Sequence, residues 1–148
     1  MNREEKELLE NELKHLEQSG RMLKHSYDKC YALAMKEEYS FDELDSFEAL
    51  TSRFARTSDV LIQKIFRLLD IIELESEGST IDRINRAEGR GLIEDAEILK
   101  DIRRLRNDIA HEYKHSAVEQ IFRNVLEFTP TILESISRVH KYCEKYLG

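Results

Sequence analysis

The chain has 148 residues, of which 36% are charged and 41% are hydrophobic, with one proline, five glycines and no tryptophan. This length suits one domain with its own hydrophobic core. The formal net charge of −7 at pH 7 argues against nucleic-acid binding by general electrostatic attraction, so an RNA site would have to be a local cationic cleft.

The composition favours long, surface-charged helices over a sheet. We therefore expect an all-α protein: one domain over 1–148, folded as an up-and-down bundle of about five helices, with a long N-terminal helical hairpin and a kinked C-terminal helix. No uncharged segment approaches the length of a membrane-crossing helix, and no apolar run follows Arg3, so we expect a cytoplasmic protein with no membrane partner. Cys30 and Cys143 lack a CxxC partner and should be buried free thiols.

The N-terminal half predicts two long helices. Near-heptad apolar spacing predicts the first helix over about 4–35. Gly20 shares that register and marks either a close approach of another helix or a weak point. Ser40 and Glu43 have capping-box spacing, and the apolar pattern that follows predicts a second helix to about Glu77.

A short helix should follow a break at 77–80. Ser79 or Thr80 can cap it, and glycines end it. Three arginines on it recur at three- and four-residue spacing, namely Arg83, Arg86 and Arg90. We expect them to be solvated surface, with a second basic edge as the alternative.

The last helix should begin after a corner at 114–116. Ser116 is placed to cap it, with Glu119 three residues on. Pro130 should kink or restart this helix, because its ring removes a backbone donor and clashes with the preceding turn.

Between these elements, residues 95–113 contain no Gly or Pro and are predicted to form a helix. Its apolar stripe consists of Ile98, Ile102, Leu105 and Ile109. At about 100° per residue, the opposite side gathers polar and basic residues, namely Lys100, Arg103, Arg104, Asn107, His111 and Lys114. Such a run can simply solvate the outer face, but an imidazole on a cationic face also suits phosphate chemistry.

The end of this helix reads RNDIAHEY, from Arg106 to Tyr113. Arg106, His111 and Tyr113 give the pattern R-x4-H-x-Y, and Asn107 follows the arginine. This pattern resembles the signature of the HEPN superfamily, specifically its HepT branch. The resemblance covers the helical layout, and its specific part is these eight residues.

The resemblance implies the toxin of a type VII-like toxin–antitoxin system, a metal-independent endoribonuclease acting on RNA such as tRNA. Arg106, Asn107 and His111 would be its catalytic residues. Tyr113 would be the residue that a partner minimal nucleotidyltransferase, the antitoxin, modifies with AMP. Four further residues, Lys100, Arg103, Arg104 and Lys114, are weaker candidates for RNA contact.

The residue types suit that reaction. Histidine has an ordinary pKa of about 6.5 and can transfer protons near neutral pH. A guanidinium presents two donors to phosphate oxygens in a fixed fork. On a regular helix, however, Arg106 and His111 point about 140° apart. We therefore expect a homodimer in which two motif helices bring these residues into one cleft, and the resemblance also implies a dimer with a shared active site.

Each motif residue also has a purely structural interpretation. His111 could be a surface or capping histidine near a helix C-terminus, where positive charge is mildly favoured. Arg106 could anchor a salt bridge to a neighbouring helix, and Tyr113 could pack half-buried beside the apolar stripe. His111 and His115 have metal-pair spacing, but no nearby Cys or third His completes a site, so we expect no metal and no cofactor.

Two other functions stay open. The chain could be a non-catalytic helical subunit that binds substrate or nucleotide for a minimal nucleotidyltransferase, as the net negative charge mildly favours. It could also be a plain helical interaction module in which the motif is accidental. The combination of Arg106, Asn107, His111 and Tyr113 favours the nuclease over both.

Overall fold

The computed structural model describes residues 1–33, 36, 38–111 and 115–147, with the backbone alone for 115–117. All regular structure in these ranges is helical, and no strand occurs among them. In chain order the elements are α1 (Arg3–Leu33), α2 (Phe41–Asp59), the π-helical η1 (Val60–Phe66), α3 (Arg67–Ile72), α4 (Thr80–Gly89), α5 (Ala96–Ala110) and α6 (His115–Leu147). The predicted all-α bundle is confirmed.

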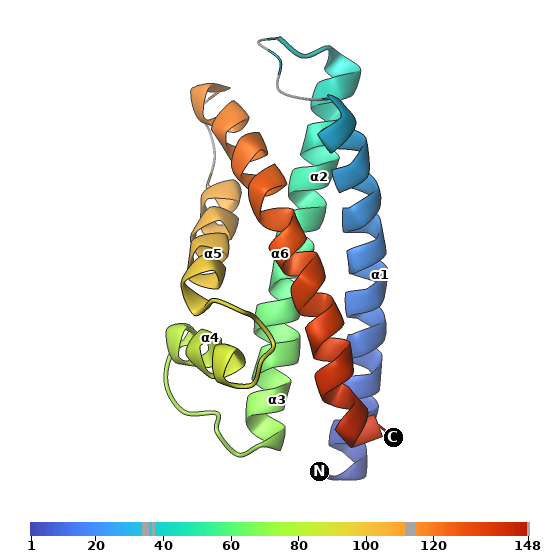
Figure 1. The fold of residues 1–148 in the computed structure, drawn as a ribbon, viewed down its shortest axis with the longest axis vertical. Helices are drawn as coiled ribbons and strands as arrows, with labels where there is room; N and C mark the ends of the chain where they lie inside the picture. The colour runs from blue at the N-terminus through green and yellow to red at the C-terminus, as the bar shows by residue number, and fades with distance from the viewer. Residues whose placement is uncertain (34–35, 37, 112–114, 148) are drawn as a thin grey trace.

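Three long rods form the body of the bundle (Figure 1). They are α1, the continuous rod α2–η1–α3, and α6, and each contacts the other two. The short helices α4 and α5 lie along one side, where α4 packs on η1 and α5 packs on α2 and α6. This arrangement places the helix that carries the predicted motif against the middle of the bundle.

The N-terminal hairpin forms as its local signals predict. The Ser40 hydroxyl accepts a hydrogen bond from the Glu43 backbone N–H at 3.1 Å, and the Glu43 carboxylate accepts one from the Ser40 N–H at 2.9 Å. This capping box satisfies two backbone donors at the start of α2. The last residues predicted for the first helix, 34 and 35, lie outside the described residues.

The central rod ends at Ile72, and its predicted extension to about Glu77 is wrong. Leu74 has a positive φ of 58° and a side chain that is 90% exposed. The Glu75 N–H donates to the Asp70 carbonyl at 2.8 Å, which reverses the chain. The rod stops here although the segment contains Leu74, because that side chain is left exposed and the remaining residues of 73–77 are polar.

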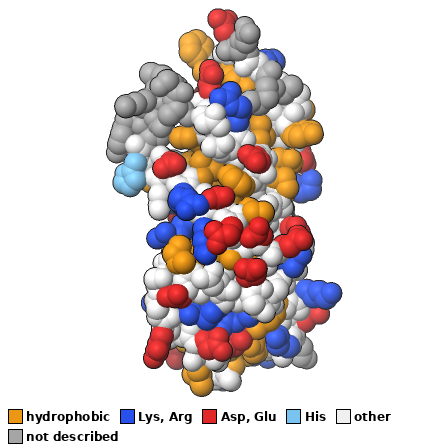
Figure 2. Space-filling view, turned by 60° about the vertical axis from the view of Figure 1, so that its left-hand side comes forward, with side chains coloured by type: hydrophobic (Ala, Val, Ile, Leu, Met, Phe, Trp, Pro, Cys, Tyr) orange, Lys and Arg blue, Asp and Glu red, His pale blue; other side chains and the backbone are white. Residues whose placement is uncertain are grey.

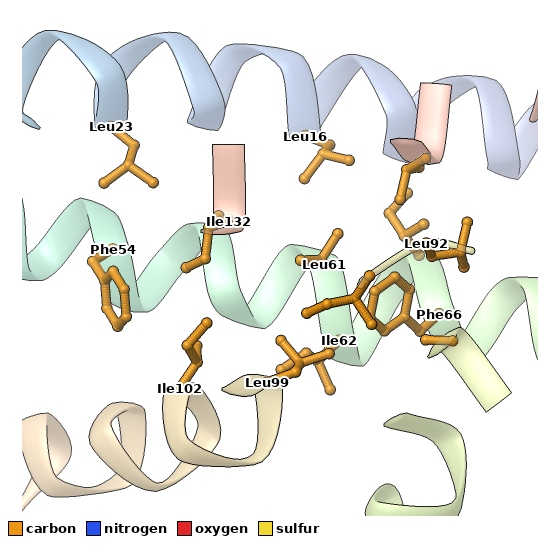
Figure 3. Packing of buried hydrophobic residues seen from close by; sticks show 14 of the residues in the cluster. Leu16, Leu23, Phe54, Leu61, Ile62, Phe66, Leu92, Leu99, Ile102 and Ile132 are labelled. Atoms are coloured by element: carbon orange, nitrogen blue, oxygen red, sulfur yellow. The ribbon is translucent and has the colours of Figure 1, made fainter. Parts of the chain in front are cut away.

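Sequence reasoning missed the π-helical segment in this rod. Leu61, Ile62, Ile65 and Phe66 are all buried, where the apolar spacing predicted a single stripe. The segment contacts α1 on one side and α4 on another. In Figure 3, Leu61 lies on the side of Leu16, whereas Ile62 and Phe66 lie on the side of the residues that follow α4 in the sequence. A wider buried surface is needed because the rod packs on two sides.

The three arginines are not solvated surface, which corrects that prediction: Arg83 and Arg86 belong to α4, and Arg90 is its C-cap. They surround the carboxylate of Asp70, a residue of α3 that is 1% exposed. Arg86 donates to both Asp70 oxygens at 3.1 and 2.8 Å, and Arg90 donates to one of them and to Glu73. A buried carboxylate needs such partners to offset its desolvation.

The long helix α6 runs from His115 through Pro130 without restarting. Ser116 therefore lies in its first turn, and its predicted place as the N-cap is wrong. A Cβ on Gly20 would come within 2.9 Å of Ile136 Cδ1, so this glycine marks the close approach of α1 and α6. Cys30 and Cys143 are buried free thiols as predicted. No described helix combines the length and apolar character of a membrane span.

Substitution of Asp70 tests how much this cluster of ion pairs stabilises the part of the bundle where α3 and α4 meet. We expect Asp70→Ala to lower the free energy of unfolding by about 3–5 kcal/mol, because it leaves buried guanidinium groups without their carboxylate. Asp101→Ala is the matched control, since its pair with Arg104 is exposed and worth about 1 kcal/mol or less. Urea unfolding measures both, and equal losses would contradict this role for Asp70.

Candidate functional site

The motif helix α5 has a defined start and end. The Asp95 side chain caps its N-terminus by accepting from the Glu97 N–H at 2.9 Å. The helix ends at Ala110, before the predicted end at Tyr113, and His111 follows as the C-cap. The His111 N–H donates to the Asp108 carbonyl at 3.1 Å, so the last turn is tightened there.

The buried face of α5 is rotated about the helix axis relative to the predicted apolar stripe. Ile102 and Leu105 are buried as predicted, but the other fully buried positions are Ala96 and Leu99. Ile98 and Ile109 are only half-buried. The buried face is rotated in this way because α5 packs against α2, α4 and α6 together. Figure 3 shows Leu99 and Ile102 pointing toward the central rod.

Arg106 is bound by Asp59 on the central rod. Its Nε donates to Asp59 Oδ1 and its Nη2 to Oδ2, both at 2.8 Å. The two side chains are 30% and 45% exposed. The hydrogen bonds that Arg106 donates to Asp59 raise the pKa of Arg106, so the guanidinium stays charged. The interpretation of Arg106 as an anchor of a salt bridge to a neighbouring helix is thus confirmed. Arg106 also lines an open cleft.

That cleft has a volume of about 640 Å³. One wall is a face of α2 at three- and four-residue spacing: Glu48, Thr51, Ser52, Ala55, Arg56 and Asp59. The facing wall comes from α5 and α6: Arg106, Ile109, Val118, Ile121 and Phe122. The cleft therefore sets a polar, charged wall opposite a mostly apolar one, as sites for small polar ligands commonly do.

Thr51 carries an unsatisfied group in this cleft. Its hydroxyl oxygen is buried and has no hydrogen-bond partner among the described residues. A buried polar atom without a partner costs about 1–3 kcal/mol, so a ligand or a second chain that pairs with it gains that energy.

The structure does not bring His111 together with Arg106 within one chain. The guanidinium is held in the cleft, whereas His111 is exposed at the end of α5 and is not among the residues that line the cleft. Asn107 is exposed on the outer side of the same helix. Tyr113 and Lys114 lie outside the described residues.

The predicted basic face of α5 is largely paired with acid. Lys100 donates to Glu97 at 2.8 Å, and Arg104 donates to Asp101. Arg103 is half-buried. Figure 2 shows basic and acidic side chains interleaved over the side that carries α4 and α5, so its described residues form no broad positive surface.

Two residues of the site, Asp59 and Thr51, were missed by sequence reasoning. Polar residues at helical spacing along 48–59 were the available signal, since they mark a second face of α2 beside its apolar one. Among the described residues, no group of three His, Cys, Asp or Glu side chains is placed to hold a metal ion. In comparisons with known proteins, no family model and no curated protein matches the chain.

The ion pair between Asp59 and Arg106 can be measured by a double-mutant cycle. We expect a coupling free energy of roughly 1 kcal/mol from Asp59→Ala, Arg106→Ala and the double variant, because the bidentate pair is only half exposed. The same cycle on Asp101 and Arg104 should give less, since that pair is more exposed. A coupling near zero for Asp59 and Arg106 would show that the pair does not fix α5.

Proposed function

We propose that the chain is the toxin of a type VII-like toxin–antitoxin pair, and that it acts as a metal-independent endoribonuclease. The observation that carries the proposal is the position of Arg106, the first residue of R-x4-H-x-Y, at the side of an open cleft. A charged, oriented guanidinium beside a cavity is suited to bind an RNA phosphate.

The proposed reaction is transfer of the phosphoryl group to the 2′-oxygen of the same nucleotide. A base removes the 2′-hydroxyl proton, the 2′-oxygen attacks phosphorus, and the bond to the 5′-oxygen breaks as that oxygen takes up a proton. The products are a 2′,3′-cyclic phosphate and a 5′-hydroxyl end. His111 is assigned to proton transfer, Arg106 to the charge that develops on the phosphate, and Asn107 to orienting it.

The proposal requires two chains. Within one chain His111 is exposed at the end of α5 and is not among the residues that line the cleft. An exposed imidazole on one protomer is free to enter the site of a second, and a two-fold axis would make two such sites. We therefore propose a homodimer in which the motif helices face each other.

The proposed regulator is a partner minimal nucleotidyltransferase that attaches AMP to Tyr113. Tyr113 is two residues from His111 in the sequence. A bulky anionic group there would oppose the approach of an RNA phosphate by charge and by volume.

A second function is supported by the same ion pair. Two donors of the Arg106 fork already bind Asp59, so an incoming phosphate must share the guanidinium or displace the carboxylate. The net charge of −7 also opposes RNA. Both observations count against RNA cleavage at this cleft and in that way favour the alternative, a non-catalytic subunit that binds substrate or nucleotide for the transferase.

Expression of the chain without a partner separates these functions. We expect wild type to arrest growth and to cleave RNA in the presence of a metal chelator. His111→Ala should lower the cleavage rate by about 10²–10⁴-fold, because it removes general acid–base catalysis. His15→Ala is the control, since His15 is an exposed histidine of α1. RNA cleavage by the purified proteins, with analysis of the product ends, is the measurement.

Harmless expression of both wild type and His111→Ala, with no RNA cleaved, would rule out the nuclease and favour the binding subunit. Co-expression with the cognate transferase tests the regulatory step. Intact-mass spectrometry should then find AMP adducts on wild type and none on Tyr113→Phe. An unmodified wild-type chain would remove that step from the proposal.

A further inference from the structure

A second cavity lies between the central rod and α4, at the end of the bundle where the turn between α3 and α4 lies (Figure 1). Its volume is about 310 Å³, and it is lined by Arg67, Asp70, Ile71, Ser76 and Arg83. None of these residues lines the cleft at Arg106. Two guanidinium groups and a hydroxyl thus share a small space with one carboxylate.

The carboxylate in this cavity is already occupied. Both oxygens of Asp70 accept hydrogen bonds from Arg86, and Oδ1 also accepts one from Arg90. Arg83 Nε lies 3.7 Å from Asp70 Oδ2, which is too long for a hydrogen bond. The hydrogen-bonding capacity of Asp70 is therefore used by two other arginines, and its carboxylate offsets the positive charge of Arg83 only poorly.

Arg83 is a cation with too few partners. Its side chain is 17% exposed, and its Nε is buried with no hydrogen-bond partner among the described residues. One Nη donates to the Gln63 side chain at 3.2 Å. Burial lowers the pKa of Arg83, and Arg67 and Arg86 lower it further, against the opposing effect of Asp70. An anion in the cavity would supply the negative partner that Arg83 lacks.

Arg67 supplies the other cationic wall. It is the first residue of α3, and its side chain is exposed. The described residues give it no hydrogen bond or ion pair, and it lines the cavity. The Arg67 guanidinium, the Arg83 Nη that does not bind Gln63 and the Ser76 hydroxyl are therefore the donors that this cavity offers to one tetrahedral anion.

We propose that this cavity binds a phosphate group, carried by inorganic phosphate or by the phosphate end of a mononucleotide. A phosphate offers several terminal oxygens to two guanidinium groups at once and carries more charge than a carboxylate. The site is separate from the cleft at Arg106, so it does not depend on the proposed nuclease function.

Calorimetric titration tests the proposal, with inorganic phosphate and AMP as separate probes at constant ionic strength. Wild type should bind at least one probe saturably. Arg67→Gln and Arg83→Gln should each weaken binding at least tenfold, because each removes a guanidinium group from the cavity. Arg67→Gln is the safer variant for folding, since that side chain is exposed. Lys64→Gln is the control, because it removes one exposed charge from the same rod without touching the cavity.

Equal binding of the two probes would identify the phosphate group alone as the ligand, and tighter binding of AMP would identify a mononucleotide. Absence of saturable binding by either probe would overturn the proposal. The proposal would also fail if Lys64→Gln weakened binding as much as Arg67→Gln, because equal weakening indicates nonspecific electrostatic attraction. Binding that is lost in Arg106→Gln and kept in Arg67→Gln would place the ligand in the other cleft and likewise overturn it.

Discussion

The bidentate ion pair between Arg106 and Asp59 ties the motif helix to the central rod. The buried face of α5 sets its distance from α2, but apolar contacts alone have little directional preference. Two hydrogen bonds at 2.8 Å add a directional contact to this packing and fix the direction of the guanidinium. Because that guanidinium borders the cleft, the same contact determines what chemistry the cleft can offer.

Local signals in the sequence were enough to predict the bundle. Apolar spacing located the long helices, and Ser40 with Glu43 marked the start of α2 because both members of a capping box lie within one turn. The end of the rod at Ile72, the π-helical segment and the buried Asp70 cluster were not predicted. Each depends on which helices pack against the rod, and a single sequence carries no direct record of those partners.

The candidate site was predicted in part, for the same reason. The motif pointed to Arg106 and α5, and the arginine does border a cleft. Its partner Asp59 is 47 positions earlier, and Thr51 earlier still, so no local pattern joins them to the motif. The separation of Arg106 from His111 within one chain is what led us to propose a site completed by a second protomer.

A subunit-mixing measurement tests that proposal most directly. Arg106→Ala and His111→Ala should each cleave RNA far more slowly than wild type when alone, because each lacks one required group. After mixing and subunit exchange, half of the dimers would be mixed and each would hold one intact site of two, so the account predicts about a quarter of wild-type activity. An inactive mixture that demonstrably contains mixed dimers would contradict a shared site at this cleft.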